Sequence, residues 1–190
     1  GNRAFYCCFN LSEIELPNSL TSIGSEAFYS CESIIDISIP NGITSINTST
    51  FCNCKNLENI DIPNGVTSIG NSAFNGCSKL TSIFIPNSVT TIGNGAFMDA
   101  QAWLTLQYPL GESIKIPNSV TSIGSSAFKE CYSLTEINLP SSVTSIGSEA
   151  FYRCENLTNI SIPYGVDSIN EWTFRGCKNL EEIKIPSSVT

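Results

Sequence analysis

The sequence predicts a mainly β, right-handed repeat solenoid with a parallel β-sheet along one face. Eight prolines recur 23 residues apart, with one longer gap of 31: Pro17, Pro40, Pro63, Pro86, Pro117, Pro140, Pro163 and Pro186. Apolar residues return at the same seven positions after each proline, and a short apolar-polar alternation precedes it. A 23-residue unit cannot bury seven apolar groups alone, so we expect stacked units to share one core.

The apolar positions, counted from each proline as position 0, are +3, +6, +10, +11, +17, +20 and +22. In one unit they are Val120, Ile123, Ala127, Phe128, Leu134, Ile137 and Leu139. The alternation from 134 to 139 predicts a strand with its apolar side chains inward. The next proline ends that strand because it has no N–H to donate. The VTSIG segment after each proline predicts a second, short strand.

The rest of the unit predicts a corner and a short turn. Position +7 is glycine in six units and asparagine in two, Asn47 and Asn170, which predicts a left-handed corner. Position +8 is Ser, Thr or Asn in seven of eight units and predicts the N-cap of a short helical or 3₁₀ turn over AFxxC. Phenylalanine at +11 in all eight units is expected to anchor this turn.

The complete pattern, CxxLxxIxLPxxVTSIGxxAFxxC, resembles the BspA-like (Treponema-type) leucine-rich repeats over nearly the whole chain. This resemblance implies a leucine-rich-repeat solenoid in a cell-surface or secreted protein of the adhesion type, which binds proteins or glycans. It implies no catalytic residues. The alternative function is a structural spacer or an intracellular scaffold without a ligand of its own.

We expect residues 1–190 to form a single solenoid of about eight repeats. Eight extra residues lie in the 31-residue gap, where two registers compete for the strand. Counted forward, the strand spans 103–108; counted back, it contains Ile114 and Ile116. We favour the second register, which leaves residues 101–110 as a bulge. Because the chain opens within a repeat, we expect a fragment of a longer chain with open apolar ends that favour end-to-end self-association.

Cysteines form a column rather than a disulfide framework. The seven cysteines at +14 are Cys8, Cys31, Cys54, Cys77, Cys131, Cys154 and Cys177, and Ala100 occupies the eighth place. Equivalent residues on successive rungs lie ~4.8 Å apart, whereas the Cβ atoms of a disulfide lie ~3.8 Å apart. We therefore expect buried free thiols. Cys7 and Cys52 lie off the column, and the sequence leaves open whether a disulfide joins them.

Composition excludes several function classes. The net charge is −8, only 14% of residues are charged and histidine is absent. Clustered Lys and Arg for nucleic acid are therefore missing, and no apolar run approaches the ~20 residues of a membrane helix. The chain also lacks a phosphate-binding loop and a nucleophile elbow. We expect no enzyme activity, no cofactor and no metal site.

Binding residues are expected on the outward strand positions, which vary while the core positions hardly do. The candidates are Glu13, Glu15, Ile35, Asp36, Asp61 and Phe84, with Trp103 and Tyr108 in the bulge. Phe84 and Ile35 place apolar groups among carboxylates, which predicts a basic partner with an apolar contact on Phe84. In the other interpretation, Phe84 only packs against its rung neighbours Asp61 and Lys115.

Overall fold

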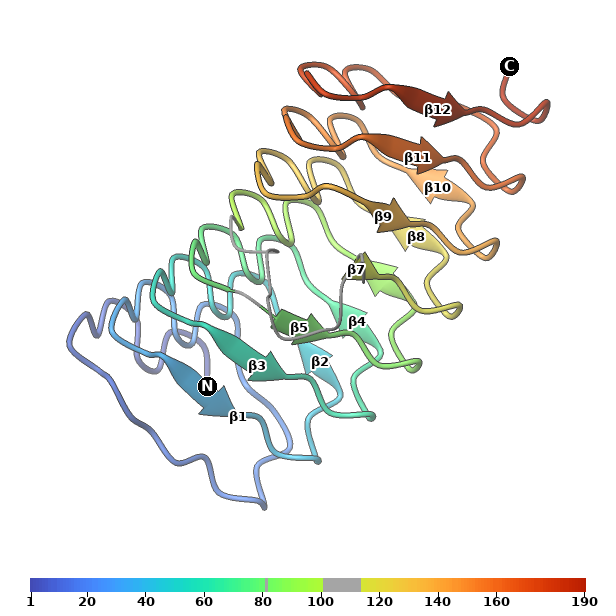
Figure 1. Ribbon diagram of the computed structural model, residues 1–190. Coiled ribbons are helices and arrows are strands. Elements are labelled where there is room, and N and C mark those ends of the chain that lie inside the picture. Colours follow the sequence, from blue (N-terminus) through green and yellow to red (C-terminus); the bar gives the residue numbers. More distant parts are fainter. Residues whose placement is uncertain (81, 101–113) are drawn as a thin grey trace.

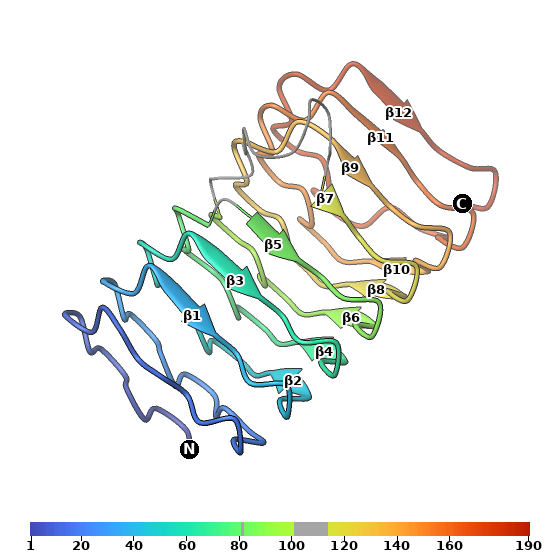
Figure 2. The ribbon, with the colours of Figure 1, turned by 60° about the horizontal axis from the view of Figure 1, so that its bottom comes forward.

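The computed structural model describes residues 1–80, 82–100 and 114–190. These residues form a solenoid whose two termini lie at opposite ends (Figure 1). Two rows of parallel strands run along it, and Figure 2 shows them on two different sides of the solenoid. The predicted solenoid fold, with a parallel sheet on one face and short second strands, is confirmed.

The strands that precede the prolines form the first row, and we call their outward side the strand face. They are β1 (Asp36–Ser38), β3 (Asn59–Asp61), β5 (Ser82–Phe84), β7 (Ile114–Lys115), β9 (Ile137–Asn138), β11 (Asn159–Ser161) and β12 (Glu182–Lys184). Hydrogen bonds join them in the sets β1-β3-β5, β7-β9 and β11-β12. An isolated bridge between Glu136 and Asn159 connects the last two sets.

The VTSIG segments form a second, uninterrupted sheet. Its strands are β2 (Ser45–Ile46), β4 (Ser68–Ile69), β6 (Thr91–Ile92), β8 (Ser122–Ile123) and β10 (Ser145–Ile146). They are joined in the order β10-β8-β6-β4-β2. The pairing of β6 with β8 crosses the long proline gap, so this sheet continues past the extra residues.

The strand before Pro117 follows the register counted back from that proline. Ile114 pairs with Ile137, and Lys115 pairs with Asn138. Residues 101–113 lie outside the described ranges. The bulge at 101–110, with Trp103 and Tyr108, therefore stays a prediction.

Columns of side chains from equivalent positions fill the core. Along the phenylalanine column, neighbouring ring centroids lie 5.2 to 5.6 Å apart with nearly parallel planes. Six rings are almost completely buried: Phe28, Phe51, Phe74, Phe97, Phe128 and Phe151. A buried phenylalanine replaced by alanine costs about 3–5 kcal/mol, so this column contributes a large part of the stability.

The segment between the second strand and the next first-row strand, which we call the turn edge, contains no helix within the described residues. Its amides alternate between two kinds of partner. The Tyr29 N–H donates to the Glu26 carbonyl in the same unit, whereas the Phe28 N–H donates to the Thr50 carbonyl in the next unit. The segment is therefore a series of tight turns that is hydrogen-bonded to the next unit. These tight turns take the place of the expected helical turn.

Position +8 also differs from the expected N-cap. The Asn71 side-chain oxygen accepts from the Asn94 backbone N–H, and the Asn94 side chain accepts from the Ser125 N–H. Both bonds run between units rather than along one turn. An asparagine at +8 thus connects neighbouring rungs.

The prediction of a left-handed corner at +7 is wrong. Positive φ angles occur instead at +9 and +13, for example at Glu26 (57°) and Ser30 (54°). At +7 a Cβ on Gly70 would lie 2.8 Å from the Asn47 carbonyl carbon of the preceding unit. Glycine is therefore needed there because two backbones approach closely, not because of its φ.

Asparagine at +7 builds a different corner. The Gly70 N–H donates to the Ile46 carbonyl of the preceding unit. In the asparagine units the side-chain amide takes this role, from Asn47 to Ile23 and from Asn170 to Ile146. These units also have threonine instead of alanine at +10. The Thr50 hydroxyl is buried and donates to the Asn47 carbonyl.

The expected column of buried thiols is confirmed in its central units. All nine cysteines are free, including Cys7 and Cys52, so these two form no bond. Each buried thiol of the column donates to a phenylalanine carbonyl of the preceding unit, as in the 3.1 Å contact from Cys54 Sγ to Phe28. Cys8 is exposed and Cys177 is only half-buried.

Candidate functional site on the strand face

Short strands position the candidate binding residues. In β1 and β3 the central isoleucines, Ile37 and Ile60, point into the core, so the residues on either side face outward. The parallel register places Asp36 beside Asn59 and Ser38 beside Asp61. Residues 36–39 and 59–61 line a shallow groove between the two strands.

Two apolar side chains stand out on this face. Phe84, at the end of β5, is 63% exposed, and Ile35, immediately before β1, is 51% exposed. The register places Phe84 next to Asp61. No stacked ring and no cation lies against the Phe84 ring among the described residues. Most of the ring surface is thus available to a partner.

Carboxylates gather around these apolar groups. Glu13, Glu15, Asp36 and Asp61 are exposed, and none forms an ion pair within the described part of the chain. The first three units contribute no Lys or Arg to the strand face. Within the described residues, this half of the face is therefore acidic and has no neutralising cation.

Charged side chains on the turn edge, unlike these carboxylates of the strand face, form ion pairs. Carboxylates there pair with cations of an adjacent unit, as Glu32 does with Lys55 at 2.8 Å and Glu149 with Lys129 at 2.6 Å. Further pairs join Arg3 to Glu26, Arg153 to Glu130 and Lys178 to Glu155.

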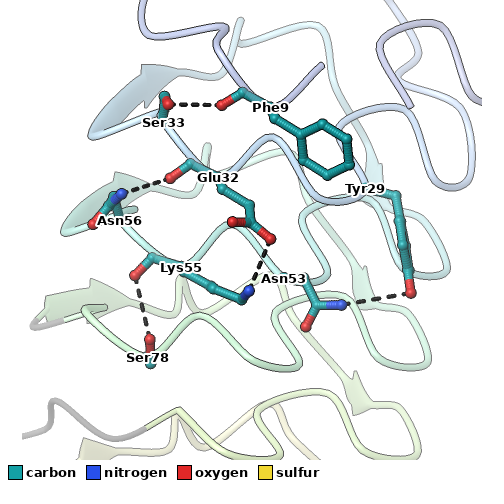
Figure 3. Close-up of polar contacts among 8 residues, drawn as sticks. All are labelled: Phe9, Tyr29, Glu32, Ser33, Asn53, Lys55, Asn56 and Ser78. Carbon is teal, nitrogen blue, oxygen red and sulfur yellow. Dashed lines mark hydrogen bonds and ion pairs between the residues drawn. The ribbon is translucent and has the colours of Figure 1, made fainter. Parts of the chain in front are cut away.

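Neutral polar groups of the turn edge also connect the units (Figure 3). The Ser33 hydroxyl donates to the Phe9 carbonyl, and the Asn56 amide donates to the Glu32 carbonyl. The Ser78 hydroxyl likewise donates to the Lys55 carbonyl. These polar groups of the turn edge thus bind neighbouring units to one another.

The six described candidates from the sequence lie on consecutive units of the strand face. Trp103 and Tyr108 lie outside the described residues. Sequence reasoning missed Ser38 and Asn59, which line the groove; their places at +21 and +19 were the available signal. It also missed four exposed aromatic residues away from this face: Tyr6, Phe9, Tyr164 and Trp172.

Two other kinds of site are absent from the described residues. No group of three or more His, Cys, Asp or Glu in the described ranges could hold a metal ion. The same ranges contain no helix that is long and apolar enough to cross a membrane.

Comparisons with known proteins agree with this architecture. The sequence profile of the BspA type leucine-rich repeat region (6 copies) matches residues 1–110 and 105–190. A crystal structure of a T. pallidum leucine-rich repeat protein is 32% identical, with a TM-score of 0.72, over 80% of this chain and 71% of that chain. No curated protein matches the chain.

A second solved structure is a leucine-rich repeat protein from Eubacterium ventriosum. It is 25% identical, with a TM-score of 0.61, over 84% of this chain and 50% of that chain. The match therefore spans half of that protein. Leucine-rich repeat proteins generally mediate protein–protein interactions.

Proposed function

Because the chain belongs to the BspA type leucine-rich repeat family, we propose that it is a protein-binding module of an adhesion-type protein. Its ligand contacts the strand face over β1, β3 and β5. The proposal assigns no catalytic step to the chain. A glycan ligand and a spacer without a ligand are the competing functions that the experiment below separates.

Phe84 carries this proposal. The other described residues at its position, +21, are polar or charged: Glu15, Ser38, Asp61, Lys115, Asn138, Ser161 and Lys184. The core does not require a ring at this place, because the side chain is 63% exposed. An exposed apolar group surrounded by polar residues is typical of an interaction site. Ile35, two units away and immediately before β1, is a second exposed apolar group on this face.

A displayed library of linear random peptides, selected on the purified 190-residue chain, tests the proposal. We expect the selected peptides to lose about 2 kcal/mol, or roughly 30-fold in Kd, with Phe84→Ser. Tyr164→Ser is the matched control, because Tyr164 is equally aromatic and exposed but lies off the strand face. Neither variant should change the melting curve, since both side chains lie outside the core.

Three outcomes would contradict the proposal. Peptides that bind both variants as well as the wild type would place the site elsewhere. Failure to enrich any binder would favour the spacer. Binding to an immobilised glycan array that depends on Phe84, without peptide binding, would favour a glycan ligand.

We also propose a cell-surface or secreted location, which is typical of BspA-like repeat proteins. The thiol column is compatible with this location, because burial raises the pKa of the Cys54 thiol and keeps it from forming the reactive thiolate. Such thiols can persist in an oxidising compartment. Antibodies against the segment should stain intact cells of the source organism; staining only after lysis would contradict this location.

End-to-end self-association of the chain stays a proposal. Sedimentation velocity over a range of concentrations would test it. A sedimentation coefficient that does not change with concentration would contradict it.

A further inference from the structure

Asp61 and Phe84 lie side by side at the ends of β3 and β5, as partners in the parallel register. Neighbouring strands are about 4.8 Å apart, and both side chains are exposed. An aromatic ring attracts a cation over its face, and a carboxylate attracts a cation at its oxygens. One guanidinium can contact both groups, because it is planar and carries several N–H donors.

We propose that the strand face recognises an arginine side chain of its protein ligand, with the guanidinium stacked on the Phe84 ring and paired with Asp61. This inference rests on the proposed function and names the chemistry of the partner. The surrounding carboxylates extend the preference to a ligand segment with further positive charges.

The turn edge already contains the same combination of groups with the arginine present. Arg153 lies over the Tyr152 ring, 5.5 Å from its centroid, and its Nη1 is 3.7 Å from Glu130. Arg3 lies over the Tyr6 ring at 5.7 Å and pairs with Glu26 at 2.9 Å. On the strand face the ring and the carboxylate are neighbours, but no cation of the described chain joins them.

Desolvation favours the same partner. A ligand that covers β1, β3 and β5 removes Asp36 and Asp61 from water. A neutral or acidic ligand would leave these carboxylates without a counter-charge, which disfavours binding. A cationic segment compensates them and also associates faster, because opposite charges steer the encounter.

Lysine satisfies the site less well than arginine. Its ammonium is strongly hydrated and compact, so it cannot stack flat on a ring while it forms two parallel bonds to a carboxylate. The chain does use Lys129 over the Tyr152 ring, at 4.8 Å. We therefore expect lysine to be accepted with lower affinity, not excluded.

Fluorescence anisotropy with two labelled probes, nona-arginine and nona-lysine, tests this preference. We expect nona-arginine to bind the wild-type chain about fivefold more tightly, corresponding to a cation–π contribution of roughly 1 kcal/mol. Phe84→Leu keeps an apolar side chain but removes the ring, so the preference should disappear. Phe84→Trp should retain it. Asp61→Asn should weaken both probes.

The matched control is Glu155→Gln, which changes the net charge as Asp61→Asn does but lies on the turn edge. It should leave both affinities unchanged. Raising NaCl from about 50 to 300 mM should weaken both probes through screening and leave their ratio intact.

Equal affinities of the two probes for the wild type, or a preference that survives Phe84→Leu, would overturn the inference. An equal loss with Glu155→Gln and Asp61→Asn would also overturn it, because only net charge would then matter. In each case the proposed function stands if library peptides still require Phe84. If those peptides bind Phe84→Ser as tightly as the wild type, the proposed function itself is wrong.

Discussion

Gly70 and Ser72 lie two residues apart in one corner, and their backbones meet different constraints. A Cβ on Gly70 would lie 2.8 Å from backbone atoms of the preceding unit, whereas Ser72 has a φ of 53°. A left-handed φ costs a residue with a Cβ roughly 1–2 kcal/mol. At the residue scale, contact between units thus requires glycine at +7 in units such as that of Gly70, while +9 tolerates a strained side chain.

We expect Gly70→Ala to lower the free energy of unfolding by about 1–3 kcal/mol, because the added methyl group overpacks the contact between rungs. Ser72→Gly should raise it by roughly 0.5 kcal/mol, because the relief of strain exceeds the entropic cost of glycine. Urea denaturation of the two variants measures both changes. A stable Gly70→Ala protein would show that the corner can open.

The buried and half-buried thiols make the stability depend on pH in the alkaline range. Burial raises the pKa of Cys31, Cys52 and Cys177 from 9.0 to about 11. Their contribution to stability is fully present below pH 9, where both folded and unfolded thiols are protonated. It is lost as the pH rises toward 11, because the unfolded chain ionises first.

We therefore expect the urea midpoint to fall between pH 9 and 11. Cys52→Ala should reduce that fall, since a single thiol contributes up to about 1.4 kcal/mol per pH unit. The comparison of the two proteins isolates the Cys52 thiol from every other group that they share. Identical pH profiles would show that Cys52 ionises normally in the folded chain.

At the scale of elements, the sequence patterns that predict the strands lie within one unit, whereas the interactions that shape the turns lie between units. The strands and their ends could be predicted because side-chain alternation and proline act within one unit. The turn edge could not, since AFxxC has the same apolar pattern in a helical turn and in a series of tight turns. Positive φ falls on residues such as Glu130 and Arg153, which carry no local signal for it. Hydrogen bonds between units impose that conformation.

In the candidate site, too, features set within one unit could be predicted, and features that depend on stacking could not. Exposure of Phe84 and Ile35 followed from the strand period, so it could be predicted. The occupied charges of the turn edge were not predicted, although Arg3 and Glu26 are spaced by one repeat. Pairing across rungs depends on the stacking of units, which a search within one unit does not detect.

The asparagine corner is an element with its own test. Asn47→Ala removes the side-chain donor to the Ile23 carbonyl and is expected to cost about 1–2 kcal/mol. Asn47→Gly together with Thr50→Ala recreates the corner of the other units and should cost less. Thermal unfolding of the two proteins compares them. An unchanged Asn47→Ala protein would mean that water or a backbone N–H replaces the lost donor.

At the scale of the whole molecule, stacking continues across the long proline gap. β6 pairs with β8, and the Phe97 and Phe128 rings stack with their centroids 5.6 Å apart. The hydrogen-bonded sets of the strand face, by contrast, change between β5 and β7. The core and the second sheet therefore hold the two parts of the solenoid together on the side away from the strand face.

Deletion of residues 102–109 tests both this architecture and the location of the ligand site. It returns the spacing from Pro86 to Pro117 to the 23 residues of the other units, so we expect a folded chain with an unchanged or higher Tm. Peptides selected on the wild type should bind the deletion variant with unchanged Kd, because Phe84 and Asp61 remain. The opposite result would be a folded deletion variant that no longer binds the peptides and a Phe84→Ser variant that still binds them. That result would assign recognition to the segment that contains Trp103 and Tyr108.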